Sequence, residues 1–288
     1  MDAVSCALLP ASCALCGSPL PRFSSVPICD FCWASIPPLA GAACVRCGDA
    51  IGNVTPALAS NSVLCRACRL APPPFVRAVA FGLYRGRLRE AIHAFKYDRL
   101  HPAARGLGRM LASAIAQLAA EAPAEMLVVP IPLHRIKHAQ RGFNQARALA
   151  REALNVLARS HPHWQLTLAS SALMRLRATE SQAGLTPHQR RANLRGAFSV
   201  TDPVAVKDKH ILLIDDIMTT GATARAAAQV LLRAGAASVW VATLARAQRM
   251  TGFHNSSADS MESVENVSSF EPVSSSGQLS SQGQRSSL

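Results

Sequence analysis

Residues 209–223 constrain the fold of this chain more than any other stretch. A short apolar run at residues 210–214 leads into Asp215 and Asp216, a turn of small residues, and good helix formers at residues 224–232. The apolar run has no turn residues and is typical of a buried strand in a parallel sheet. A strand followed by acids, a turn and a helix start places a ligand at the carboxyl end of a sheet.

The turn that follows the two aspartates has the composition of an anion-binding site. Its residues are small or hydroxylated: Thr219, Thr220, Gly221, Ala222 and Thr223. Free N–H groups at a helix start, with a glycine that permits close approach, suit a phosphate. The aspartates would repel that phosphate, so we expect them to face hydroxyl groups or a hydrated Mg²⁺. A ribose 5-phosphate meets this description, and a solvated acidic turn before a capped helix is the alternative.

The same string, D-D-I-M-T-T-G-A-T, resembles the phosphoribosyl-pyrophosphate (PRPP) motif of type I phosphoribosyltransferases. The resemblance implies that Asp215 and Asp216 contact the ribose 2′- and 3′-hydroxyls and that the turn holds the 5-phosphate. A Walker-type nucleotide loop does not fit, because no lysine follows the glycine.

Eight of the nine cysteines fall into four C-x-x-C pairs. Two such pairs complete a closed tetrahedral zinc site, which leaves no position for catalytic water. The repeat of C-A-L-C-G as C-V-R-C-G predicts two consecutive zinc ribbons with one structural ion each. The first ion is assigned Cys13, Cys16, Cys29 and Cys32, and the second Cys44, Cys47, Cys65 and Cys68. Interleaved pairing stays open, and disulfides are disfavoured in a cytosolic chain.

Composition limits the class of protein further. The chain has 288 residues, an apolar fraction of 49% and a formal net charge of +13. This charge favours polyanionic partners such as nucleic acid or phosphorylated metabolites, although a solvated basic surface would produce it equally well. The N-terminus is a poor signal peptide and no apolar run reaches the length of a membrane span, so we expect a cytoplasmic protein.

Three prolines at residues 72–74 mark a domain boundary. We expect a double zinc ribbon over residues 1–72, a phosphoribosyltransferase-like domain over 73–250, and a disordered Ser-rich tail over 251–288. Within the second domain the apolar pattern predicts further strands at residues 75–84, 126–129 and 238–244, and helices at residues 88–95, 103–120 and 145–158.

Two basic segments flank the predicted site. After the strand at residues 126–129, a loop with His134, Arg135, Lys137, His138 and Arg141 places donors at a strand's carboxyl end, as pyrophosphate binding requires. Residues 173–198 form a second basic stretch, which suits a loop that orders over a bound ligand. An ordinary solvated loop or an exposed basic helix is the alternative for each.

Taken in order, the cysteine pairs, F-K-Y, P-I-P-L, R-G-F-N-Q-A, R-x-x-x-S-Q and the PRPP motif resemble the ComF family. The resemblance implies a type I phosphoribosyltransferase fold, an α/β parallel sheet flanked by helices, preceded by the small double zinc ribbon. It places Pro132, Arg135 and Arg141 in PRPP binding at the pyrophosphate side. It also implies a mobile loop over residues 177–191, with Arg177 as a catalytic residue beside Asp215 and Asp216.

Two functions from different classes fit this sequence. In the first, an enzyme of DNA uptake binds Mg²⁺-PRPP and transfers phosphoribosyl to an unidentified acceptor, with Mg²⁺ and arginines stabilising the leaving group. In the second, a non-catalytic zinc-ribbon accessory or PRPP sensor engages single-stranded DNA or a DNA-import helicase.

Overall fold

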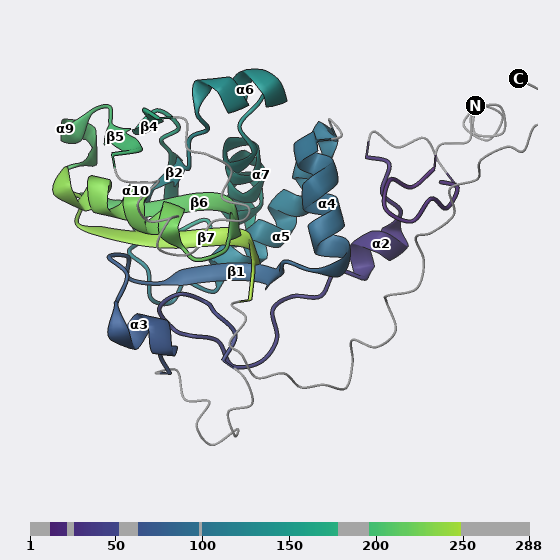
Figure 1. Ribbon diagram of the computed structural model, residues 1–288, viewed down its shortest axis with the longest axis horizontal. Helices are drawn as coiled ribbons and strands as arrows, with labels where there is room; N and C mark the ends of the chain where they lie inside the picture. The colour runs from purple at the N-terminus through teal and green to yellow at the C-terminus, as the bar shows by residue number, and fades with distance from the viewer. Residues whose placement is uncertain (1–11, 22–25, 52–62, 98–99, 178–195, 249–288) are drawn as a thin grey trace, which may run out of the picture. The chain divides into compact units, whose positions relative to one another are not determined.

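The computed structural model describes residues 12–21, 26–51, 63–97, 100–177 and 196–248 (Figure 1). A parallel sheet of five strands lies at the centre of these residues, in the order β1-β7-β6-β2-β3. The strands are β1 (Ala78–Leu83), β2 (Glu125–Pro130), β3 (Gln165–Leu168), β6 (His210–Met218) and β7 (Ser238–Arg246). The predicted fold class is confirmed.

Strand β6 lies in the interior of the sheet, and its apolar residues face both sides. Ile211 and Leu213 belong to one hydrophobic core, whereas Leu212 and Ile214 belong to the other. The sequence predicted a strand that ends at residue 214, and this boundary was wrong. Because β6 pairs with β7 as far as Met218, both aspartates lie within the strand rather than after it.

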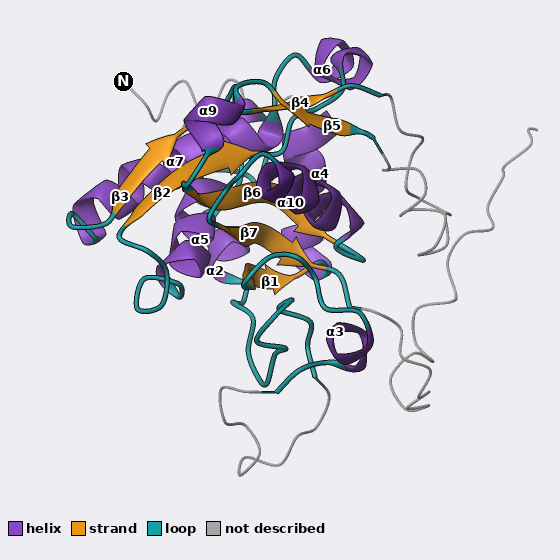
Figure 2. Cartoon of the chain, turned by 90° about the vertical axis from the view of Figure 1, so that its left-hand side faces the viewer, coloured by secondary structure: helices purple, strands orange, loops and turns teal. Residues whose placement is uncertain are grey.

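Helices cover the two faces of the sheet. Helices α5 (Ala104–Ala116) and α7 (Gln145–Ser160) pack on one face, and α10 (Ala222–Arg233) packs on the other (Figure 2). A Cβ atom built on Gly108 of α5 would lie 2.3 Å from the Glu152 Cβ of α7, so a glycine permits this close helix pair. Helix α4 (Gly86–Tyr97) and the 3₁₀ turn η2 (His101–Ala103) lead into α5.

The basic segment after β2 is helical, although the sequence predicted a loop. His134 caps helix α6 (Arg135–Arg141), accepting a hydrogen bond from the Ile136 N–H, and Gly142 ends the helix in the left-handed region at φ 77°. A cap and a terminal glycine at this spacing are ordinary helix limits, which the density of basic residues obscured.

The second basic segment begins and ends in a small antiparallel pair. Strand β4 (Leu173–Arg175) pairs with β5 (Phe198–Val200), and the short helix α9 (Pro203–Val206) follows. The predicted mobile loop at residues 177–191 lies outside the described residues except for Arg177, and the predicted tail at residues 251–288 also lies outside them.

The cysteine-rich segment packs against the sheet through both cores. It carries the helices α2 (Asp30–Ala34) and α3 (Arg66–Leu70). Cys13 and Cys32 join the core on the α5 and α7 side, whereas Cys44, Cys47 and Cys68 join the core on the α10 side. Among the helices of the described residues, none is long and apolar enough to cross a membrane.

Candidate functional site

The site lies where the direction of the sheet topology reverses. From the adjacent strands β2 and β6, the chain moves outward to β3 on one side and to β7 on the other. Such a reversal leaves a crevice at the carboxyl ends of the two central strands. A cavity of about 410 Å³ opens there, lined by residues that follow β2, by the end of β6 and by the start of α10.

An acidic pair from β6 forms the floor of this cavity. The Lys96 ammonium on α4 lies 2.9 Å from Asp216 Oδ2, and both side chains are 13% exposed. Asp215 Oδ1 accepts a hydrogen bond of 2.9 Å from the Asp216 N–H. Loss of solvent around the Asp215 carboxyl, together with the charge of Asp216, raises the pKa of Asp215 to about 7.

Lys96 is a site residue that sequence reasoning did not assign. Burial by itself would lower its pKa, but the neighbouring Asp216 and Asp215 carboxylates outweigh burial and raise it. The only sequence signal was its place in the F-K-Y string of the ComF resemblance. Nothing in the pattern of α4 indicated that this lysine meets the acidic pair.

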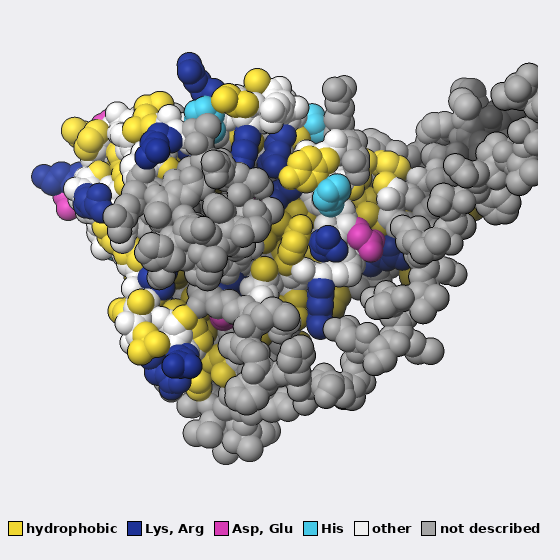
Figure 3. All heavy atoms as spheres, viewed as in Figure 1, with side chains coloured by type: hydrophobic (Ala, Val, Ile, Leu, Met, Phe, Trp, Pro, Cys, Tyr) yellow, Lys and Arg dark blue, Asp and Glu magenta, His cyan; other side chains and the backbone are white. Residues whose placement is uncertain are grey.

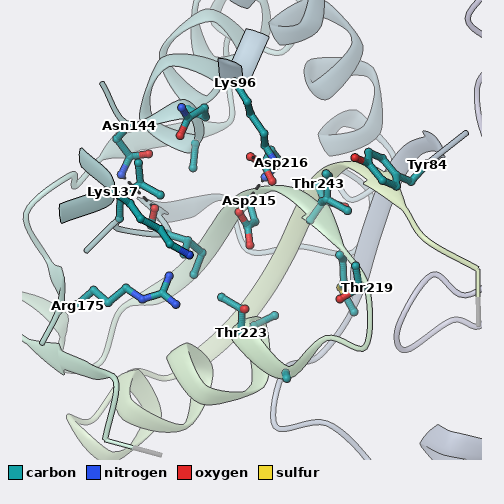
Figure 4. Close-up of a pocket in the computed structure, with 18 of the residues that line it drawn as sticks. Tyr84, Lys96, Lys137, Asn144, Arg175, Asp215, Asp216, Thr219, Thr223 and Thr243 are labelled. Atoms are coloured by element: carbon teal, nitrogen blue, oxygen red, sulfur yellow. Dashed lines mark hydrogen bonds and ion pairs between the residues drawn. The ribbon is translucent and has the colours of Figure 1, made fainter. Parts of the chain in front are cut away.

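Three further cations enter the cavity from the side of α6 and β4. They are Lys137, Arg141 and Arg175. Burial, followed by repulsion from Arg175, Arg141 and Lys96, lowers the pKa of Lys137. Figure 4 shows Lys137 and Arg175 reaching in on one side of Asp215, with Thr219 on the other. Positive groups held this close together favour a ligand that is a multiply charged anion.

The turn between β6 and α10 has the geometry of an anion cradle. Gly221 caps α10 in the left-handed region at φ 76°, and a Cβ at this position would lie 3.0 Å from Met218 Cε. The Thr220 hydroxyl accepts a hydrogen bond of 3.4 Å from the Ala222 N–H. Thr219, Gly221, Ala222 and Thr223 line the cavity, so the helix start faces the space above the acidic pair.

Not every residue assigned from the sequence reaches this cavity. Within the described part of the chain, Asp215, Asp216 and Arg141 line it with the turn residues, whereas Pro132, Arg135, Arg177 and Thr220 do not. The neighbours of Pro132, namely Ile131 and Leu133, form that part of the wall, and Arg135 is exposed at the start of α6.

Gln145, at the start of α7, is a second residue that sequence reasoning missed. It lines the cavity and is 1% exposed, and its Oε1 accepts a hydrogen bond of 3.2 Å from Arg141 Nη1. Arg141 Nη2 in turn donates to the Tyr97 hydroxyl at 3.1 Å. Gln145 Nε2 has no hydrogen-bond partner among the described residues, which leaves a buried donor for a ligand.

The cysteines form two separate groups of four. In each group the sulfur atoms lie within 4.8 Å of one another, and the pairing is the consecutive one assigned from the sequence. The Sγ–Sγ separations are 3.8 Å for Cys13–Cys32, 3.7 Å for Cys16–Cys29 and 3.6 Å for Cys47–Cys65. A zinc ion bound by four thiolates requires about 3.8 Å between sulfurs. Both clusters therefore fit one zinc ion each, and interleaved pairing is ruled out.

The fold and these two clusters define a class of protein, an α/β phosphoribosyltransferase-type domain preceded by a double zinc ribbon. Family models agree: one described as a phosphoribosyl transferase domain matches residues 139–275, and one described as a double zinc ribbon domain matches residues 4–69. The DNA utilization protein YhgH of Salmonella typhi is 33% identical over 241 residues, which cover 83% of this chain and 98% of that protein.

Two further relatives are named for competence. Competence protein F of Haemophilus influenzae is 28% identical over 188 residues, covering 64% of this chain and 78% of its own length. Competence protein ComFC of Bacillus subtilis is 36% identical over 121 residues, covering 42% and 44%. The chain belongs to the ComF family, whose members include these DNA-utilization and competence proteins.

Proposed function

We propose that the cavity binds Mg²⁺-PRPP and that the protein transfers its phosphoribosyl group to a nitrogenous acceptor. The observation that carries this proposal is the arrangement of charge around the cavity. The turn at the start of α10, the acidic pair and the cations Lys137, Arg141 and Arg175 line the same cavity. Asp215 lies between Thr219 of the turn and the cations Lys137 and Arg175 (Figure 4). PRPP has the matching order of 5-phosphate, ribose hydroxyls and pyrophosphate.

Each part of the ligand finds groups of suitable chemistry. The N–H groups at the start of α10 and the hydroxyls of Thr219 and Thr223 would hold the 5-phosphate. Ionised Asp215 and Asp216 would accept hydrogen bonds from the two ribose hydroxyls. The cationic side of the cavity would then hold pyrophosphate, on which negative charge increases as it leaves C1.

The acidic pair is also the donor set that a divalent cation prefers. Carboxylate oxygens beside an anion site suit Mg²⁺, which keeps several waters and shares the ligand's phosphate oxygens. Bound there, Mg²⁺ would neutralise part of the pyrophosphate charge. Lys96 already balances Asp216, so Asp215 is the freer of the two carboxylates for this role.

In the reaction, the C1–O bond to pyrophosphate breaks and the acceptor nitrogen supplies the electron pair of the new C1–N bond. Pyrophosphate leaves with the electrons of the old bond, and the proton of the acceptor passes to pyrophosphate or solvent. The chain's own contribution is to orient the ribose and to stabilise the leaving group through Lys137, Arg141 and Arg175. The relatives named as a DNA utilization protein and as competence protein F support a role for this reaction in DNA uptake or use.

Calorimetric titration of Mg²⁺-PRPP tests the proposal. Asp215→Asn with Asp216→Asn removes two charged hydrogen-bond acceptors, and we expect binding to weaken by at least about 100-fold. The control variant is Asp208→Asn with Glu125→Gln, which makes the same change of charge at two exposed positions outside the cavity. Asn tolerates the left-handed φ of 59° at position 208. Equal affinity in the wild type and the Asp215/Asp216 variant would contradict the assignment.

A second function, as a non-catalytic nucleic-acid accessory, is favoured by the surface. Lys and Arg side chains predominate over acidic ones on the face in Figure 3, and the net charge is +13. Binding to single-stranded DNA should then weaken steeply with salt. It should also survive the Asp215/Asp216 substitutions, because in this second function the basic surface, and not the acidic pair, would contact the DNA. Saturable DNA binding with no PRPP binding by the folded wild type would make this function the leading one.

A further inference from the structure

Arg246, the last residue of β7, is a buried cation that the PRPP reaction does not use. It is 1% exposed and lies behind the cavity wall rather than in it. A guanidinium carries five N–H donors in a fixed plane, so when buried it holds several acceptors in one geometry. Its partners therefore show which parts of the molecule it fastens together.

One set of partners belongs to the phosphate-binding turn. Arg246 Nη1 donates to the Met218 carbonyl at 2.7 Å and also to the Thr219 carbonyl, where β6 passes into the turn. These carbonyls fix the path of the backbone just before Gly221. A change in their position would move the N–H groups that face the ligand.

The other set of partners belongs to the second cysteine cluster. Arg246 Nε donates to the Cys47 carbonyl at 3.2 Å, and Nη2 lies 3.5 Å from Asp49 Oδ1. Asp49 is itself 6% exposed. Cys47 belongs to the second cluster. The Arg246 side chain therefore contacts both the loop that carries this zinc ligand and the phosphate-binding turn.

A second contact joins the same two regions from the far side of the turn. Arg225 of α10 donates to the Ala71 carbonyl at 2.7 Å and to the Pro72 carbonyl at 3.1 Å, just beyond the second cluster. The phosphate turn is thus connected to the ribbon before and after its glycine. The first cluster packs on the other face of the sheet.

We propose that Arg246 is a positioning residue that ties the phosphate-binding turn to the second zinc cluster, so that occupancy of this cluster and affinity for the phosphorylated ligand are coupled. The coupling to ligand affinity rests on the proposed function, whereas the structural connection between the turn and the cluster through Arg246 does not. Because such coupling is reciprocal, bound Mg²⁺-PRPP should raise the affinity of the second cluster for zinc and leave that of the first unchanged.

Hydrogen–deuterium exchange of the full chain, with no ligand added, tests whether Arg246 holds the turn in place. In Arg246→Met we expect faster exchange at residues 215–224, while α5 and α7 exchange as in the wild type. Arg246→Lys should give intermediate protection, since one ammonium replaces part of the donor set. Arg233→Met is the matched control, because Arg233 is exposed at the end of α10, the helix that follows the turn. Unchanged exchange at residues 215–224 in Arg246→Met would overturn the proposal.

Cysteine substitutions that remove zinc test the same connection from the side of the second cluster. Cys44→Ser with Cys47→Ser should increase exchange at residues 215–224, whereas Cys13→Ser with Cys16→Ser should not. In calorimetry we expect Arg246→Met to bind Mg²⁺-PRPP about tenfold more weakly. If the variants show the exchange effects but the wild type binds no PRPP, the proposed function fails and the structural connection through Arg246 stands. If the wild type binds PRPP and neither Arg246→Met nor the Cys44/Cys47 variant changes exchange at residues 215–224, the proposed connection is contradicted and the proposed function is not.

Discussion

Asp215 makes the stability of the protein depend on pH in an unusual direction for an aspartate. Its pKa is raised from 3.8 to about 7 by loss of solvent and by Asp216. Between these values the unfolded state has released the proton and the folded state retains it. The free energy of unfolding should therefore fall as pH rises from about 4 to about 7, by a few kcal/mol at about 1.4 kcal/mol per pKa unit.

Asp215→Asn should remove this decline, because an amide does not ionise. We expect the variant to be more stable than the wild type at pH 7.5, with the difference shrinking as pH falls towards 4. Urea denaturation of both proteins across this pH range is the measurement. A constant difference at every pH would show that Asp215 has an ordinary pKa. A site residue that lowers stability in its ionised form is expected where binding needs a desolvated charge.

The residues of the site were predictable to the extent that they are neighbours in the sequence. Asp215, Asp216 and the turn form one string, so their chemistry could be read together. Lys96 and Gln145 come from other helices, and only the tertiary fold brings them to the cavity. Arg135 and Arg141 are the first and last residues of helix α6. Because the sequence predicted a loop there, it could not indicate which of the two arginines lines the cavity.

At the scale of elements, the contact between α5 and α7 depends on a missing side chain. Gly108→Ala would place a Cβ 2.3 Å from Glu152 Cβ and 3.2 Å from the Glu152 carbonyl carbon. Separating the helices should outweigh the gain in helix propensity and destabilise the fold by about 1–3 kcal/mol. Chemical denaturation measures this loss. Arg109→Ala, at the next and exposed position, should change stability by less than about 0.5 kcal/mol.

Element types were predicted more reliably than element ends. The apolar patterns located β1, β2, β7, α5 and α7, because each element buries one face or both. The end of β6 was wrong because backbone pairing with β7 continues through two charged residues. Helix α6 was missed because none of its residues is buried, so it has no apolar stripe to detect.

At the scale of the whole molecule, the two cysteine clusters join the ribbon to opposite faces of the sheet. Their geometry predicts about two zinc ions per chain in protein purified under reducing conditions. Elemental analysis of the wild type should give this value, and Cys13→Ser with Cys16→Ser should give about one. A wild-type value near zero would contradict the assignment of both clusters. Substituting a cluster should also lower the melting temperature, since these thiols belong to the cores.

The strand order has a consequence for how the chain is made. Strand β1 lies at the edge of the described sheet and pairs with β7, from Ala78 opposite Val241 to Leu83 opposite Arg246. The ribosome synthesises β1 first and β7 last among the described strands, and contacts so distant in sequence form slowly. Until β7 is synthesised, β1 therefore lacks its partner strand, and its unpaired backbone N–H and C=O groups can pair with other chains. Emergence of a single late segment both completes the sheet and docks the ribbon through Arg246.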